Sequence, residues 1–193
     1  MTTPNDHATQ QLKALQAAGR QDRARTLSAL NSVFRSGIVP STPLDGRYDG
    51  QLMALDIAPG VTRVVEGITS RWLPWKGKRF EAATSRGDNI FTRDSLKFTR
   101  VLWPFYRGVV DDRPGTYRAF VFHTSTGPGL LDTDRQVLRL DYNIPGNPKR
   151  TLRRILDEVV EIGDGVYLGK AYVRWWWGKW QLVAYFGLSK SIG

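Results

Sequence analysis

Turn-forming residues interrupt the chain at short intervals from residue 44 onward, and this feature constrains the fold most. Examples are the Asp-Asp-Arg-Pro-Gly of 111–115, the Pro-Gly-Asn-Pro of 145–148 and the Gly-Asp-Gly of 163–165. Short runs with strand-like residues lie between such breaks. We therefore predict strands at 47–56, 78–83, 89–92, 95–102, 106–111, 116–124, 135–143, 155–162, 166–177 and 180–189.

Many short strands joined by tight turns are typical of a β-sandwich or a β-barrel. Closure into a barrel removes exposed strand edges, and a meander of sequence neighbours is the simplest path to closure. The predicted fold is therefore mainly β. It is a single antiparallel up-and-down barrel of roughly eight to ten strands.

Two helical segments accompany the predicted strands. An apolar stripe predicts a helix over 8–35, with Gly19 as a weak point. A second apolar face predicts a short helical lid over 61–72, after the first strand and near one barrel mouth. We divide the chain into an N-terminal helical extension, 1–40, and a β-barrel domain, 41–193.

Charge and composition narrow the function classes. The 193 residues include no cysteine and carry a formal net charge of +10. Without cysteine there are no disulfides or thiolate metal sites. The N-terminus lacks a signal-peptide pattern and no apolar run could span a bilayer, which predicts a cytoplasmic protein. Basic charge attracts nucleic acid, anionic membranes and acidic ligands, and its densest run is Lys149-Arg150 with Arg153-Arg154.

Catalytic signatures are missing from the sequence. It has no Gly-x-Ser-x-Gly, P-loop or Rossmann motif. We therefore predict no cofactor and no metal, and we leave the catalytic residues unassigned. Asp157 and Glu158 are interpreted as solvated surface charges. Nucleic acid is disfavoured as a partner because no RNP-type, zinc or helix-turn-helix motif occurs. His123, beside a predicted strand, is a candidate ligand contact, although a hydrogen-bonded structural role is the commoner use of a single histidine.

The strand at 166–177 offers two interior faces. One face carries Lys170, Tyr172 and Arg174, and we expect Tyr172 and Arg174 to meet the acidic group of a ligand there. The alternative gives an apolar pocket, leaves Lys170 and Arg174 in solvent, and places the opposite face inside: Tyr167, Ala171, Val173 and Trp175. The small residues Gly169 and Ala171 favour it, because they would leave room for a ligand.

Further candidates lie on the neighbouring strand and in the segment 72–80. Arg139 either joins the polar interior or belongs to a surface ion pair, and Tyr142 lies on the other face of its strand. Trp75 and Lys78 combine an aromatic ring with a cation, a pairing that suits a carboxylate or phosphate head group at a cavity mouth.

Three consecutive tryptophans, 175–177, precede Gly178. Adjacent strand residues point to opposite faces, so at least one of them, Trp176, is expected to face outward or lie at a barrel mouth. The cluster could seal a barrel end, line a pocket, stack on bases or anchor in a membrane interface.

The order of elements resembles that of the calycins, which include lipocalins and fatty-acid-binding proteins. Locally, Trp-Lys-Gly-Lys-Arg-Phe at 75–80 is similar to the Trp-x-Gly-Lys-x-Phe element of bacterial domains named for a Gly-x-Trp-x-Gly motif. Segments 141–145 and 166–169 loosely resemble the C-terminal half of those domains. At 46–50, however, Tyr48 replaces the motif's tryptophan, and the lipocalin disulfide is absent. The resemblance implies a barrel with a small-molecule cavity.

Three functions follow as hypotheses. The leading one is binding of a small apolar or amphipathic ligand, such as a fatty acid, an isoprenoid or an aromatic metabolite. The second is a cofactor-free isomerase, cyclase or decarboxylase that uses the same cavity. The third is a basic surface module for nucleic acid or anionic membrane, which includes peripheral membrane contact. Salt dependence separates the third from the others, because binding to phosphates weakens steeply with salt.

Overall fold

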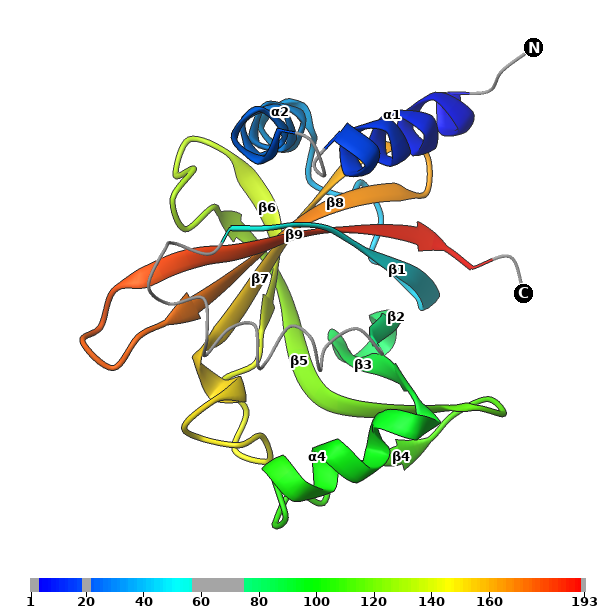
Figure 1. The fold of residues 1–193 in the computed structure, drawn as a ribbon, viewed down its shortest axis with the longest axis vertical. Helices are drawn as coiled ribbons and strands as arrows, with labels where there is room; N and C mark the ends of the chain where they lie inside the picture. The colour runs from blue at the N-terminus through cyan, green and yellow to red at the C-terminus, as the bar shows by residue number, and fades with distance from the viewer. Residues whose placement is uncertain (1–3, 19–21, 57–74, 192–193) are drawn as a thin grey trace.

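The computed structural model of the chain describes residues 4–18, 22–56 and 75–191, shown in Figure 1. The helices are α1 (Pro4–Ala18), α2 (Arg23–Ser36) and α4 (Leu96–Leu102), with short 3₁₀ turns η1 (Ala82–Thr84), η2 (Arg93–Ser95) and η3 (Leu152–Arg154). The strands are β1 (Gly46–Leu55), β2 (Trp75–Glu81), β3 (Arg86–Thr92), β4 (Val110–Asp111), β5 (Thr116–Pro128), β6 (Gln136–Asp141), β7 (Ile155–Gly163), β8 (Val166–Arg174) and β9 (Trp180–Lys190).

The strands form one antiparallel sheet in the order β3-β2-β1-β9-β8-β7-β6-β5-β4. Strand β3 also pairs with β5, so eight strands close into a barrel and the two-residue β4 lies outside the ring. The prediction of a mainly β, antiparallel barrel with an N-terminal helix is confirmed. Closure leaves no unpaired edge in the eight-stranded ring.

Apolar side chains separate into an interior and an exterior group. The interior group is rich in aromatic rings, and Tyr48 there packs edge-on against Phe80 and Tyr167. On the outside, Leu30 and Phe34 of α2 pack in a second cluster with Leu168. Helices α1 and α2 therefore cover one outer face of the barrel (Figure 1).

Two local predictions are not matched by the described structure, and a third concerns residues outside it. The predicted strand at 95–102 is wrong, because this segment forms α4. Ser95 and Thr99, one helical turn apart, both hydrogen-bond the buried Tyr117 hydroxyl, at 3.1 Å and 2.7 Å. The predicted strand at 106–111 shrinks to β4. The predicted helix at 61–72 lies outside the described residues.

Candidate functional site

A buried lysine occupies the barrel interior and uses all three of its ammonium donors. Lys78 Nζ lies 2.8 Å from Asp157 Oδ2, 2.6 Å from the Tyr142 hydroxyl and 2.8 Å from Asn89 Oδ1. The Tyr142 hydroxyl also donates to Asp157 Oδ2 at 3.0 Å. All four residues are buried. We call Lys78, Asn89, Tyr142 and Asp157 the interior cluster.

Aromatic rings enclose the ammonium group of this cluster. Lys78 Nζ lies between 5.1 and 5.5 Å from four ring centroids, those of Trp75, Phe122, Tyr142 and Phe186. Rings at this distance attract a cation through their quadrupoles, the more strongly where water is excluded. The cluster is therefore a polar site surrounded by these four aromatic rings, which we call the aromatic chamber.

An irregularity in β2 aims two of these side chains inward. Trp75 and Lys78 are three residues apart, so a regular strand would place them on opposite faces. The pairing register between β2 and β3 shifts between Trp75 and Gly77. The extra residue in this bulge, Lys76, lets both Trp75 and Lys78 face the interior.

Glycines allow the aromatic rings to lie against the barrel wall. A Cβ on Gly50 would be 2.4 Å from the Trp75 ring, and one on Gly169 would be 2.2 Å from the Phe186 ring. In the alternative assignment of the β8 faces, Gly169 would leave room for a ligand. The structure places the Phe186 ring against it instead.

Asn89 is held by a strained part of β5. Phe120 has a φ of 60°, which is uncommon for a bulky residue. Its carbonyl accepts from Asn89 Nδ2 at 3.2 Å, and its N–H donates to the Tyr106 hydroxyl at 2.6 Å. Backbone strain of this kind persists only where its surroundings over-determine it. Here the two hydrogen bonds fix the peptide units on either side of Phe120. The bond from Asn89 Nδ2 to the Phe120 carbonyl orients the Asn89 side chain so that its Oδ1 reaches Lys78.

Tyr106→Phe is expected to lower the free energy of unfolding by about 1 kcal/mol at pH 7, because the Phe120 N–H loses its acceptor. Burial raises the pKa of Tyr106 from 10.0 to about 12. Above pH 10 the unfolded parent chain therefore releases this proton first, and the parent loses stability that the variant keeps. Urea titrations at about pH 8 and pH 11 should show the difference narrowing by roughly 1 kcal/mol. A constant difference would contradict the assignment.

Burial governs the protonation of the interior cluster. Burial lowers the pKa of the Lys78 ammonium, and the negative charge of Asp157 opposes this shift. Burial also raises the pKa of the Tyr142 hydroxyl well above its ordinary value. Tyr142 therefore stays protonated at neutral pH and serves as a hydrogen-bond donor. An internal ion pair is rarely more stabilising than apolar residues of the same size. The Lys78–Asp157 pair is therefore a candidate for a functional role.

Three of the predicted site residues, Trp75, Lys78 and Tyr142, meet in this chamber. Lys170 and Tyr172 are buried on the outer side of β8, where Lys170 Nζ contacts Asn31 Oδ1 of α2 at 2.8 Å. The expectation that Tyr172 and Arg174 face the cavity is wrong. Arg174 is exposed, and Tyr167 and Ala171 take the interior positions of β8.

The other two predicted residues also lie outside the chamber. Alternation along β5 puts Phe122 inside, so His123 faces outward, where it is exposed. On β6, Leu140 belongs to the interior, and Arg139 is therefore on the outer face, opposite Glu158 of β7. The exterior position matches the surface alternative for Arg139, but no ion pair of Arg139 is found among the described residues.

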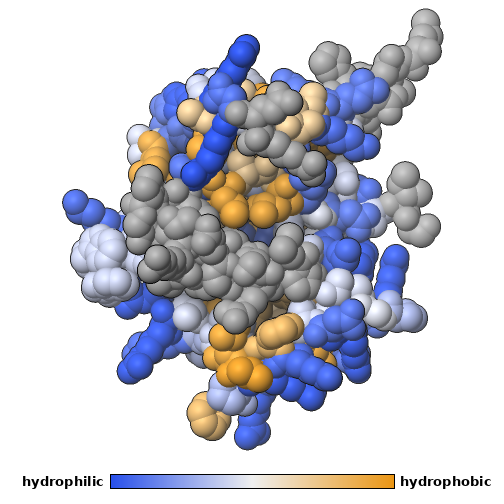
Figure 2. Space-filling model, viewed as in Figure 1, coloured by the Kyte–Doolittle hydropathy of each residue, from blue (hydrophilic) through white to orange (hydrophobic). Residues whose placement is uncertain are grey.

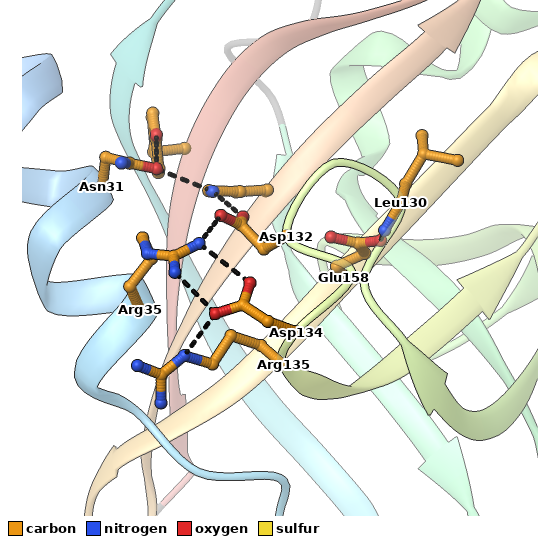
Figure 3. A network of polar contacts seen from close by, with 9 residues as sticks. Asn31, Arg35, Leu130, Asp132, Asp134, Arg135 and Glu158 are labelled. Atoms are coloured by element: carbon orange, nitrogen blue, oxygen red, sulfur yellow. Dashed lines mark hydrogen bonds and ion pairs between the residues drawn. The ribbon is translucent and has the colours of Figure 1, made fainter.

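The outer polar network, drawn in Figure 3, ties α2 to the barrel. Lys170 Nζ and Arg35 both bind Asp132 in the connection after β5, and Arg35 also binds Asp134 at 2.7 Å. Buried Glu158 accepts from the Leu130 N–H in the same connection. The ion pairs of this network join α2 to the connection after β5 and to β8. The network therefore holds α2 against the barrel.

Two members of the interior cluster, Asp157 and Asn89, were not predicted as site residues from the sequence. Asp157 and Glu158 were interpreted as solvated charges, and this was wrong because both are buried. The available signal was the position of Asp157 inside an apolar strand rather than at its end. Asn89 opens the predicted strand 89–92 and carries no comparable signal.

Comparisons with protein-family models, with curated proteins and with solved structures found no match for this chain. The architecture is consistent with a calycin-like barrel, and nothing found supports the local resemblance to the Gly-x-Trp-x-Gly domains. Among the described residues, no helix is long and apolar enough to cross a bilayer. Within the same residues, no three His, Asp or Glu side chains are grouped to hold a metal ion.

Proposed function

We propose that the protein binds a small, mainly apolar molecule in the barrel, with a carboxylate or carbonyl group that contacts Lys78 and Tyr142. The observation that carries the proposal is the fully buried interior cluster within its aromatic chamber. Ligand sites commonly combine apolar walls with a few convergent polar groups that fix orientation. A fatty acid, an isoprenoid acid or an aromatic metabolite has this chemistry.

The contacts within the cluster indicate how such a group would be accommodated. Asp157 balances the charge of Lys78, while Asn89 and Tyr142 are neutral partners. An acceptor atom of the ligand would replace one neutral partner, so that Lys78 keeps three hydrogen bonds. This exchange avoids leaving a buried donor unpaired, which is the main cost of polar recognition in an apolar interior.

The enzymatic alternative would use the same cluster, because burial lowers the pKa of Lys78 and a desolvated lysine amine is a potential nucleophile. Binding is favoured over catalysis because the donors and acceptors of the cluster are engaged with one another. A catalytic base or nucleophile needs a free lone pair directed at a substrate atom.

Fluorescence titration with cis-parinaric acid, a fluorescent fatty acid, tests the proposal. We expect saturable one-to-one binding that oleate displaces and that changes less than about twofold between 0.05 and 0.5 M NaCl, because the contacts are buried. The methyl ester of the probe should bind at least about tenfold more weakly, since it lacks the charged acceptor. Absence of saturable binding, or a steep decline with salt, would contradict an interior site.

A further inference from the structure

The two mouths of the barrel differ in charge. Successive antiparallel strands place alternate connections at the same end. One end carries ten basic and three acidic residues in its three described connections, 93–115, 142–154 and 175–179. The described connections at the other end carry one basic and three acidic residues, in 82–85, 129–135 and 164–165. We call the first end the basic mouth.

Large apolar side chains project from the basic mouth. In and after α4, Phe105 is 93% exposed and Val101 is 77% exposed, and at the β8–β9 turn Trp176 is 76% exposed. Phe98, Leu102 and Trp177 are exposed as well. Figure 2 shows the apolar surface over α4 at the lower end of the molecule, bordered by hydrophilic surface.

One side of helix α4 faces the barrel and the other, which is apolar, faces outward, as a docking surface requires. Ser95 and Thr99 face the barrel through their bonds to Tyr117. The side turned away from the barrel carries Phe98 and Val101. Lys97 and Arg100 are exposed beside them, and neither has an acidic partner within salt-bridge distance among the described residues.

Direct contacts join the connections of the basic mouth into one rim. Trp103 Nε1, at the end of α4, donates to Thr151 Oγ1 at 2.9 Å. Arg154, in the same connection as Thr151, donates to the Arg174 carbonyl at 3.4 Å, next to the tryptophan turn. Figure 1 shows α4, this connection and the β8–β9 turn following one another along the lower and left edge. The three connections are therefore linked into one rim that carries both apolar and basic residues.

We propose that the basic mouth docks on the surface of an anionic lipid bilayer. Exposed Phe, Leu and Val side chains enter the boundary between headgroups and acyl chains, and tryptophan rings settle at the headgroup level. Lysine and arginine around them, above all Lys149 and Arg150, pair with lipid phosphates. Base stacking would explain the tryptophans, but Val101 and Leu102 have no partner in a nucleic acid. This inference is independent of what the barrel interior binds.

Sedimentation of the full chain with vesicles tests the proposal. We expect binding to phosphatidylcholine vesicles that contain about a third phosphatidylserine, and at least tenfold weaker binding to pure phosphatidylcholine. Phe105→Ser with Trp176→Ser should weaken binding at least about tenfold, and so should Lys149→Glu with Arg150→Glu. All four positions are exposed, so circular dichroism should show unchanged folding.

Two matched variants control for general loss of apolar surface or charge. Ile38→Ser removes an apolar side chain that is 62% exposed outside the basic mouth, and Lys13→Glu with Lys190→Glu makes the same charge change elsewhere. Both should bind within about twofold of the parent. The proposal is overturned if the parent ignores anionic vesicles or if the controls weaken binding as much. It is also overturned if a single-stranded oligonucleotide binds in preference to the vesicles.

Discussion

Replacing Asp157 by asparagine is expected to lower the free energy of unfolding by about 3 kcal/mol at pH 7. The side chains of Lys78 and Asp157 are 3% and 6% exposed, and their charged atoms are 2.8 Å apart. Removing the carboxylate leaves an ammonium group that is buried in an aromatic chamber without a counter-charge. Surface ion pairs contribute far less, because water screens them.

The loss in Asp157→Asn should diminish as the pH rises from 7 toward 10. Burial lowers the pKa of Lys78 below its unfolded value of 10.5, and Asp157 opposes this shift, so removing Asp157 lowers the pKa further. The unfolded chain therefore binds this proton more tightly than the folded chain, and the difference is larger in the variant than in the parent. The free energy of unfolding therefore rises with pH between the folded and unfolded pKa values. Urea titrations across this range provide the measurement.

The double variant Lys78→Met, Asp157→Asn is the control for this interpretation. It removes both charges, and we expect it to recover most of the lost stability, because no buried charge is left without a counter-charge. A double variant as unstable as Asp157→Asn would show that the loss arises from packing rather than from the unpaired charge.

Gly77→Ala is the second variant with a large expected effect, a loss of about 3 kcal/mol. Gly77 has a φ of +143°, and a Cβ built on it would lie 2.0 Å from the Tyr48 carbonyl oxygen. The obstacle is backbone of the neighbouring strand, which has no rotamer with which to yield. Since Gly77 lies in the bulge that turns Lys78 inward, we also expect weaker binding of cis-parinaric acid.

Gly127→Ala is the matched control for this glycine. It lies in β5, and the nearest atom to an added Cβ is Arg139 Cδ at 3.6 Å, an ordinary contact. The free energy of unfolding should change by less than about 0.5 kcal/mol, as for most open strand positions. Thermal unfolding of both variants decides the matter, and equal losses would contradict the steric argument.

The sequence pattern predicted the barrel because turn chemistry is local. Gly-Asp-Gly at 163–165 and Gly178 mark turns whatever surrounds them. The segment that became α4 is short and mixed, and its conformation depends on Tyr117, which is distant in sequence. Tertiary contacts overrode local preference there.

The sequence predicted the candidate site only in part, because part of the site depends on contacts between residues distant in sequence. Trp75 and Lys78 carried a local signal, an aromatic ring next to a cation. The inward face of β8 was ambiguous because both faces are buried, one in the chamber and the other beneath α2, so neither is polar throughout. The interior cluster itself depends on the β2 bulge, which is set by strand pairing.

The dissociation constant for cis-parinaric acid, measured for two paired variants, tests the central claim most directly. Lys78→Met with Asp157→Asn removes the internal ion pair. Lys170→Met with Asp132→Asn removes a comparable lysine–aspartate pair, equally buried at the lysine and also beside an aromatic ring, on the outside of the barrel. We predict at least about tenfold weaker binding for the first variant and a change of less than about twofold for the second. Equal effects of the two variants, or none for the first, would contradict a ligand site at Lys78.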